Sequence, residues 1–312
     1  MEPDLDAVII GGGAAGLSAA QMLGRSRRRT LVVDGGLPRN RFAAHVHGVL
    51  GHDGVEPGAL LGRGRAEARA YGVEIVPGTV TALSDAGDRL RVTLADGTAH
   101  RARIVVIATG IRDELPPIPG LAEEWGRGVL HCPYCHGWEV AGQRLGVVAV
   151  SAASSHQIQL VRQLSAEVTA FTGTAAGLDE PALEALAARG IRVEPSPVSA
   201  VARDGAALVV RTDGGAEHRL DALFTAGAPG MDLAFAADLA LARSEGPGSP
   251  LDVDLTGRTS HPRVFACGNV VAPFGTVPVA TASGSMTGAG VNAALVAADV
   301  ALAVAAHRGR GG

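Results

Sequence analysis

The sequence contains no lysine, so all 27 basic side chains are arginine. A P-loop lysine, a Schiff-base lysine and a pyridoxal-phosphate enzyme are excluded, because each needs an amine that can lose its proton. Three cysteines in 312 residues are too few for a secreted disulfide framework. The formal net charge of -4 lacks the basic excess of a nucleic-acid-binding protein. We therefore predict a protein of a reducing compartment that has no nucleic-acid partner.

Export and membrane signals are also missing from the sequence. The first residues, Met1 to Asp6, are acidic where a secretory signal would be positive. The most apolar late stretch, Val291 to His307, contains Asn292 and Asp299 and falls short of the ~20 apolar residues that span a bilayer. We predict that this stretch is a buried, alanine-rich helix closing a domain, and that the protein is cytoplasmic with no membrane partner.

The length and the order of apolar runs predict two domains. A chain of 312 residues exceeds what one hydrophobic core usually supports. Residues 6–34 have the order strand, glycine turn, helix, strand, and residues 145–171 repeat the order of strand, helix and strand. Between them the proline-rich segment 115–120 cannot be helical, which makes it the best boundary. We predict an α/β protein of two Rossmann-like, three-layer FAD/NAD(P)-type domains, the second (116–242) inserted between the halves of the first (1–115 and 243–312).

The first glycine turn has the features of a dinucleotide site. Gly11, Gly13 and Gly16 have G-x-G-x-x-G spacing between a strand and a helix, and Asp34 ends the next strand. The first glycine permits the tight turn, the second lets the backbone approach a pyrophosphate at the helix N-terminus, and the third allows helix–strand contact. Asp34 would accept hydrogen bonds from an adenosine ribose. Among 43 glycines such spacing alone also fits a structural turn, but the acid in this context favours a dinucleotide.

The corresponding turn of the second domain has no such glycines. Residues 150–156 read Val-Ser-Ala-Ala-Ser-Ser-His, and side chains there would obstruct a pyrophosphate. After the following strand, residues 172–175 include no arginine that could take a 2′-phosphate. We predict a nicotinamide-type domain whose site is degenerate, with functional NADPH binding left as the alternative.

Two of the cysteines form a pair. Cys132 and Cys135 have Cys-x-x-Cys spacing, which suits a redox-active disulfide, and His136 next to them can act as the acid/base that makes one sulfur a thiolate. A zinc site using His131 and His136 and a purely structural pair are the alternatives, but no second ligand pair completes a tetrahedron, so we predict no metal. Cys267, in an apolar strand, is predicted to be a buried hydrophobe.

Taken together, these motifs resemble the low-molecular-weight thioredoxin reductases along essentially the whole chain. The resemblance rests on the glycine fingerprint, Ala108-Thr109-Gly110, the Cys-x-x-Cys inside an inserted domain, and the Phe-Ala-Cys-Gly-Asn-Val string at 265–270. The chain departs from that family in three places. His136 and Asn269 stand where the family has aspartate, and the second glycine fingerprint with its arginines is missing.

At these three places the chain resembles one branch of the family, the FAD-dependent dithiol oxidases that make the disulfides of gliotoxin, holomycin and romidepsin. The branch shares the string Cys-x-x-Cys-His-Gly-aromatic-Glu, and the lysine-free composition looks actinobacterial, which favours the holomycin type. The resemblance implies FAD, a homodimer, and Cys132, Cys135 and His136 as catalytic residues. The fingerprint, the loop after Asp34 and the family motifs together give these expected cofactor-binding residues: Gly11, Gly13, Ala14, Ala15, Gly16, Asp34, Arg39, Asn40, His45, Ala108, Thr109, Gly110, Gly268, Asn269, Val279 and Ala280.

Two segments are expected to lie beside the cofactor. His45 and His47 lie in a loop that commonly borders the cofactor, where they are either solvated or assist proton transfer. The helix expected from about Val279 and Ala280 would direct its positive N-terminus toward the flavin, a placement that comes from the family.

The predicted activity is oxidation of a small-molecule dithiol, of the dithiolopyrrolone type, to its intramolecular disulfide. With no nicotinamide site, the electrons are expected to leave through FAD to O2, giving H2O2. One alternative is a reductase of thioredoxin-like proteins fed by ferredoxin or another donor that is not NADPH. The other is a non-catalytic flavin sensor that is oxidised once without turnover.

Overall fold

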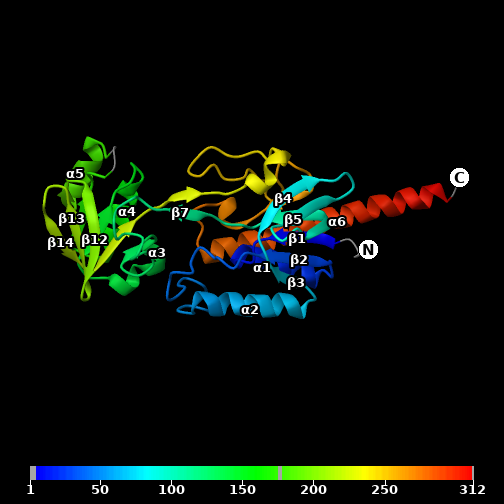
Figure 1. The fold of residues 1–312 in the computed structure, drawn as a ribbon, viewed down its shortest axis with the longest axis horizontal. Coiled ribbons are helices and arrows are strands. Elements are labelled where there is room, and N and C mark those ends of the chain that lie inside the picture. Colours follow the sequence, from blue (N-terminus) through cyan, green and yellow to red (C-terminus); the bar gives the residue numbers. More distant parts are fainter. Residues whose placement is uncertain (1–4, 175–177, 311–312) are drawn as a thin grey trace. The chain divides into compact units, whose positions relative to one another are not determined.

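The computed structural model describes residues 5–174 and 178–310 and divides the chain into two compact units. The first unit comprises residues 1–41, 58–112 and 229–312, and the second comprises 42–57 and 113–228 (Figure 1). The chain therefore leaves the first unit, builds most of the second, and returns. Strands β7 (Arg112–Glu114) and β16 (Ala228–Gly230), at the two crossings, pair with each other.

A seven-stranded sheet forms the centre of the first unit. Its order is β3-β2-β1-β6-β5-β4, with β17 paired to β6. On one edge β6 pairs in parallel with β1. On its other edge it pairs antiparallel with β5 through Ala99 to Ala102 and then in parallel with β17 through Val105 to Ile107. The elements of this unit are β1 (Leu5–Ile10), α1 (Ala14–Arg25), β2 (Thr30–Asp34), α2 (Pro57–Ala70), β3 (Glu74–Pro77), β4 (Val80–Asp85), β5 (Leu90–Leu94), β6 (Ala99–Ile107), η2 (Ala234–Leu239), β17 (Val264–Ala266), η3 (Gly268–Val270) and α6 (Val277–Gly309).

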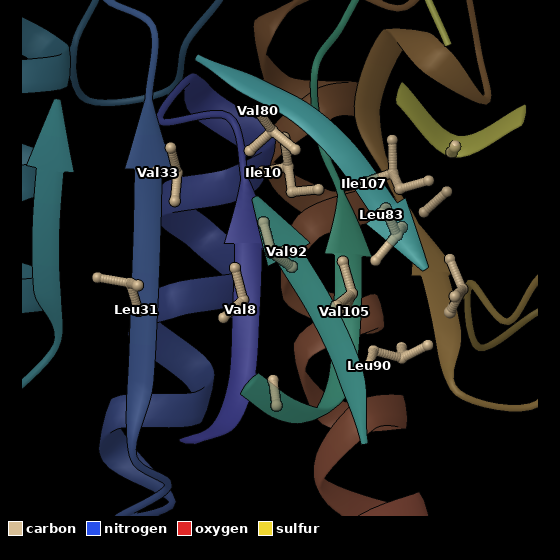
Figure 2. Close-up of a cluster of buried hydrophobic side chains, with 14 of the residues drawn as sticks. Val8, Ile10, Leu31, Val33, Val80, Leu83, Leu90, Val92, Val105 and Ile107 are labelled. Atoms are coloured by element: carbon tan, nitrogen blue, oxygen red, sulfur yellow. The ribbon is translucent and has the colours of Figure 1, made fainter. Parts of the chain in front are cut away.

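Both faces of this sheet are buried, as expected for parallel strands covered on two sides. Along β1, Val8 and Ile10 point into one apolar cluster, which also contains Leu31, Val105 and Ile107 (Figure 2). The intervening residues of β1, Ala7 and Ile9, point into the cluster shared with α1 and α6. Alternation along one strand thus supplies both layers of the core.

Helices α1 and α6 pack very closely on the same face. A Cβ placed on Gly284 would lie 2.0 Å from the carbonyl oxygen of Ala15, and one on Gly288 would lie 2.8 Å from that of Ala19. Only glycine permits this approach, which explains part of the glycine content of α6. The close contact fixes the first turn of α1, where Ala15 lies, against the early turns of α6.

The last turns of α6 differ from the prediction. The helix begins at Val277 rather than at Val279, and its residues from 301 onward are all exposed. The prediction of a buried helix for 291–307 is therefore wrong beyond Leu295, because α1, which covers the earlier turns, is far shorter than α6. Taken over its full 33 residues, α6 is long and apolar enough to cross a membrane by length and composition alone. Figure 1 shows its C-terminal end extending past the sheet.

The second unit contains a five-stranded parallel sheet of order β11-β10-β9-β15-β8 and a three-stranded antiparallel sheet of order β12-β13-β14. Two apolar clusters form its core. Its elements are β8 (Val129–Leu130), α3 (Pro133–His136), η1 (Trp138–Val140), β9 (Leu145–Val148), α4 (Ser154–Leu164), β10 (Val168–Phe171), α5 (Glu180–Ala188), β11 (Arg192–Glu194), β12 (Val198–Asp204), β13 (Ala207–Thr212), β14 (Glu217–Leu220) and β15 (Ala222–Thr225).

These elements confirm the two-domain α/β fold, and a hairpin around Gly97, which has a φ of +86°, joins β5 to β6. They also differ from the predicted segments in two respects, the first being that residues 42–57, assigned from sequence to the first domain, belong to the second unit. Residues 229–242, assigned from sequence to the inserted domain, pack through Ala236 and Leu239 into the core of the first unit. A proline-rich loop shows only where helices and strands end. The boundary between the two units depends instead on which core each segment packs against.

Candidate functional site

The glycine turn of the first unit leaves the N-terminus of α1 open. Gly11 has a φ of +113°, and a Cβ there would lie 2.3 Å from the carbonyl oxygen of Ala108, so the tight turn requires glycine. A Cβ on Gly16 would lie 1.9 Å from the carbonyl oxygen of Gly11. At Gly13, by contrast, a Cβ would meet nothing within 4 Å, and Gly13 provides no side-chain cap. The first amide bonded within the helix is that of Leu17, to the Gly13 carbonyl, which leaves the amides before it available to an anion.

Asp34 lies beside this turn and is held on two sides. Its Oδ1 accepts a hydrogen bond from the Gly36 amide at 2.9 Å. Its Oδ2 accepts from the Arg65 guanidinium, 2.9 Å from Nη2 and 3.3 Å from Nε. A Cβ on Gly12 would lie 2.4 Å from the Asp34 Cγ, so this middle position of the fingerprint must also be glycine. Neither Arg65 nor Gly12 was among the predicted site residues.

Arg39 and Asn269 converge on one loop of the first unit. The Arg39 Nη1 donates to the Pro273 carbonyl at 2.8 Å. The Asn269 Nδ2 donates to the carbonyls of Ala272 at 2.9 Å, Pro273 at 3.3 Å and Gly275 at 2.8 Å. A carboxylate has no hydrogen to donate, so an aspartate at position 269 would not make these bonds. The departure from the family aspartate therefore has a structural reason.

The other predicted cofactor-binding residues of the first unit lie on β6, α1, α6 and the loops next to them. Ala108 continues β6, with its amide bonded to the Ile10 carbonyl, and Gly110 turns the chain with a φ of +69°. The Gly268 amide donates to the Ser283 hydroxyl on α6. Further predicted positions are distributed as follows: Ala14 and Ala15 in the first turn of α1, Val279 and Ala280 in the first turn of α6, exposed Thr109 after β6, and half-buried Asn40 in the turn after Arg39.

The equivalent turn in the second unit is closed by a side chain. The Ser154 hydroxyl, at the start of α4, accepts hydrogen bonds from the amides of Val150 at 3.0 Å and Ser151 at 3.3 Å. The amides of Ser154, Ser155 and His156 donate to carbonyls of residues 151–153. These backbone donors, which would cradle a pyrophosphate, are satisfied within the turn itself.

The cysteine pair lies at the start of α3. Cys132 is the N-cap residue, Pro133 opens the helix, and the amides of Cys135 and His136 both donate to the Cys132 carbonyl at 3.1 Å. Both cysteines are half-buried. The next position, Gly137, has to be glycine, because a Cβ there would lie 2.3 Å from the Pro133 carbonyl oxygen and 2.5 Å from the Leu164 side chain. The Cys-x-x-Cys-His-Gly string thus forms one tight turn packed on α4.

His136 is half-buried beside this pair, and this burial lowers the pKa of its imidazole below 6.5. Among the smaller contributions, the Glu139 charge raises this pKa, and His47 and His131 lower it. The imidazole is therefore neutral at neutral pH and able to accept a proton. Glu139, exposed on η1, also lies 3.3 Å from His47 Nε2, and the other ring nitrogen of His47 is 3.3 Å from Asp53. Glu139 was not predicted as a site residue, although it ends the family string.

The histidine loop is part of the second unit. Residues 42–57 cluster with the unit that carries the cysteines, so His47 joins the surroundings of His136. The His45 Nδ1 bonds to the Gly54 carbonyl at 3.1 Å within the loop. Cys267 is fully buried, which raises the pKa of its thiol to about 12 and confirms it as a core residue. No group of three or more His, Cys, Asp or Glu side chains in 5–174 and 178–310 is placed to hold a metal ion.

These features define a class. An open fingerprint in one α/β unit and a Cys-x-x-Cys turn in an inserted α/β unit are the parts of a flavin disulfide oxidoreductase. The chain belongs to the pyridine nucleotide-disulphide oxidoreductase family, whose model matches residues 5–284. As a member related to thioredoxin reductases, it is an FAD-binding flavoenzyme. The donors at the α1 N-terminus and the open space at Gly13 fit such a cofactor.

Several known proteins resemble the chain over nearly its whole length. Thioredoxin reductase sirT from Leptosphaeria maculans is 32% identical, covering 95% of this chain and 96% of its own. Thioredoxin reductase tcpT from Claviceps purpurea is 31% identical, covering 91% and 92%. The crystal structure of HlmI superposes with a TM-score of 0.93 at 39% identity, covering 100% of this chain and 99% of its own. An oxidoreductase from Agrobacterium tumefaciens gives a TM-score of 0.88 at 37% identity, covering 94% and 99%.

Proposed function

We propose that the protein oxidises a small-molecule dithiol to its intramolecular disulfide and passes the electrons through FAD to O2. The observation that carries this proposal is the closed turn at Ser154. A family member whose second unit has no open dinucleotide cradle needs an electron partner other than NADPH. The string Cys-x-x-Cys-His-Gly-aromatic-Glu, which resembles that of the dithiol oxidases, supports a small-molecule substrate over a protein one.

The first unit supplies the proposed FAD site. The amides at the start of α1 would bind the pyrophosphate, and Asp34 would accept hydrogen bonds from the adenosine ribose. Arg39 and Asn269 would hold the 272–275 loop along the cofactor. The uncapped first turn of α6, which contains Val279, would place positive helix dipole near the flavin ring. Bound FAD would take two electrons from the reduced cysteine pair and give them to O2, forming H2O2.

The cysteine pair would carry out the sulfur chemistry. With the pair oxidised, a substrate thiolate attacks the Cys132 sulfur, which forms a mixed disulfide and releases Cys135 as a thiolate. The second substrate thiolate then attacks the substrate sulfur of this mixed disulfide, closing the product disulfide and expelling Cys132. Two substrate S–H bonds are lost, one S–S bond forms, and the pair has gained two electrons and two protons. The overall reaction converts a dithiol and O2 into a cyclic disulfide and H2O2.

His136 is the proposed acid/base for these steps. Its burial keeps the pKa below that of a solvated imidazole, so the neutral ring can take the proton of an incoming thiol near pH 7. Only the thiolate attacks a disulfide, so this deprotonation controls the rate of the first step. Glu139 would stabilise the protonated ring, since its carboxylate raises the His136 pKa.

One assay tests the proposal. The purified flavoprotein is given a small dithiol, such as reduced holomycin or dithiothreitol, in air, and H2O2 release and O2 consumption are followed with and without NADPH. We expect turnover that requires O2 and is unchanged by NADPH. The alternatives give different results: a thioredoxin-like reductase would act on protein disulfides and need a separate donor, and a sensor would oxidise one equivalent of dithiol and stop. Either outcome would overturn the proposal.

We also propose a cytoplasmic homodimer in which α6 contributes to the interface. The C-terminal half of α6 exposes Val296, Val300 and Val304 at spacings of four residues, along one side of the helix. Such a stripe on a helix that its own unit does not cover is suited to pairing with a second copy. Light scattering of the wild type and of Val300→Glu tests this, and a wild-type monomer would contradict it.

A further inference from the structure

We propose that Arg65 is a positioning residue for the adenosine end of FAD, acting through Asp34. It lies on α2, outside the glycine fingerprint and its flanking strands, so no motif identifies it. Its guanidinium contacts the Asp34 Oδ2 with both Nη2 and Nε. The inference rests on FAD binding and is independent of the proposed dithiol oxidation.

The geometry around Asp34 fixes the direction of its carboxylate. The Gly36 amide donates to Oδ1 and the Arg65 guanidinium donates to Oδ2. Gly12 leaves room for the Asp34 Cγ, which would lie only 2.4 Å from a Cβ at position 12. A carboxylate can accept about four hydrogen bonds, two on each oxygen. The Gly36 amide and the two guanidinium nitrogens take three of these four positions, which orients the carboxylate and leaves one acceptor position, on Oδ1, for a ribose hydroxyl. Both side chains are partly buried, with exposed fractions of 26% for Arg65 and 15% for Asp34, so the contact is shielded from bulk water.

Charge gives Arg65 a second effect on the same site. The fingerprint itself, Gly11 to Gly16, has no charged side chain, and a dinucleotide would bring two negative phosphate charges to its amides. The Asp34 carboxylate would repel those charges at short range. The guanidinium, 2.9 Å away, compensates this repulsion, so that the acid can serve the ribose without weakening the pyrophosphate contact.

The test uses the intact protein stripped of FAD, with FAD, ADP and 2′-deoxy-ADP as the probes in calorimetric titrations. Wild-type protein should bind ADP more tightly than 2′-deoxy-ADP. Arg65→Gln should weaken FAD and ADP about tenfold, the typical effect of losing a hydrogen bond to a charged group, and should reduce the preference for ADP over 2′-deoxy-ADP. Arg65→Lys, which keeps the charge but not the fork, should be intermediate. Arg69→Gln, an exposed arginine on the same helix, should behave as wild type.

A double variant separates positioning from a general structural role. In the Asp34→Asn background, Arg65→Gln should cause little further loss of ADP affinity, because Arg65 acts through the carboxylate. Unchanged affinity and nucleotide preference in Arg65→Gln would overturn the proposal. So would an equal loss for ADP and 2′-deoxy-ADP together with a lower thermal midpoint, or fully additive losses in the double variant.

Discussion

The Ser154 hydroxyl accepts a hydrogen bond from the Val150 amide at 3.0 Å, and this contact closes the turn that opens α4. The Ser151 amide donates to the same oxygen at 3.3 Å. In the first unit the corresponding turn has no such side-chain acceptor at its N-cap, Gly13. Two α/β units of similar connectivity thus differ in whether their N-terminal amides are available to a phosphate.

Replacing Ser154 with alanine should destabilise the second unit. Two amides of the turn lose their acceptor, at a cost of about 1–2 kcal/mol in the free energy of unfolding. Thermal unfolding monitored by near-UV circular dichroism should show a lower midpoint for Ser154→Ala. The neighbouring Ser155→Ala, whose side chain is only half-buried, is the control. Equal midpoints for the two variants would mean that the hydroxyl contributes nothing to the turn.

Serine at either Cys132 or Cys135 should abolish dithiol oxidation and leave FAD bound, because a hydroxyl cannot form the disulfide that receives the substrate electrons. H2O2 release and the flavin absorbance of the purified variants measure the two effects. Cys267→Ala is the matched control, since burial raises the pKa of that thiol to about 12 and keeps it protonated. Full turnover by either serine variant is incompatible with the mechanism.

The pH dependence should report His136. Burial lowers its pKa below 6.5, so the neutral base is present at neutral pH and is lost only as the pH falls through that lowered value. The acid limb of kcat/KM should therefore lie below pH 6.5. His136→Ala should lose at least about 100-fold in rate at pH 7 and recover part of it above pH 8.5, where thiols ionise unaided. A variant without a rate loss at pH 7 would exclude His136 as the base.

Removal of the Glu139 charge should move that acid limb. Its carboxylate raises the His136 pKa, so Glu139→Gln lowers this pKa further and shifts the limb to more acidic pH. The imidazole proton resonances of His136 measure the pKa directly by NMR titration. Glu123→Gln, an exposed acid of the same unit, should leave the titration unchanged. A shift toward higher pH would show that the sign of this interaction is wrong.

Gly284→Ala should loosen the contact between α6 and α1. The new Cβ would lie 2.0 Å from the Ala15 carbonyl oxygen, and relieving such an overlap costs about 1–3 kcal/mol. Because Ala15 is in the turn that would bind the pyrophosphate, the variant should show both a lower thermal midpoint and less bound FAD. Gly309→Ala, where a Cβ meets nothing within 4 Å, is the control. Unchanged FAD content would contradict the prediction, because it would show that the α1–α6 contact at Gly284 is not needed for cofactor binding.

Local spacing was sufficient to predict several parts of this protein. The fingerprint from Gly11 to Gly16 and the Cys132–Cys135 pair depend on residues a few positions apart, and their turns are determined by glycine conformations and short hydrogen bonds. The two-domain α/β fold followed from the order of apolar runs. The burial of Cys267 followed from its apolar strand.

Contacts between distant segments were not predictable in this way. Arg65 is 31 positions from Asp34, and nothing in the sequence near either residue indicates their pairing. Glu139 and His47 are brought together from two separate segments of the second unit. The three carbonyl acceptors of Asn269 belong to an irregular loop, whose path depends on packing rather than on a repeating pattern.

The sequence by itself determined the class of fold, the open fingerprint and the Cys-x-x-Cys turn, because each depends on residue type at short spacing. Tertiary structure decided which charges surround Asp34 and His136, and how closely α1 and α6 pack at Gly284. It also left the last turns of α6 exposed, where composition had indicated burial. The physical reason is that burial and electrostatic partners are properties of the assembled chain, set by segments that meet only after folding.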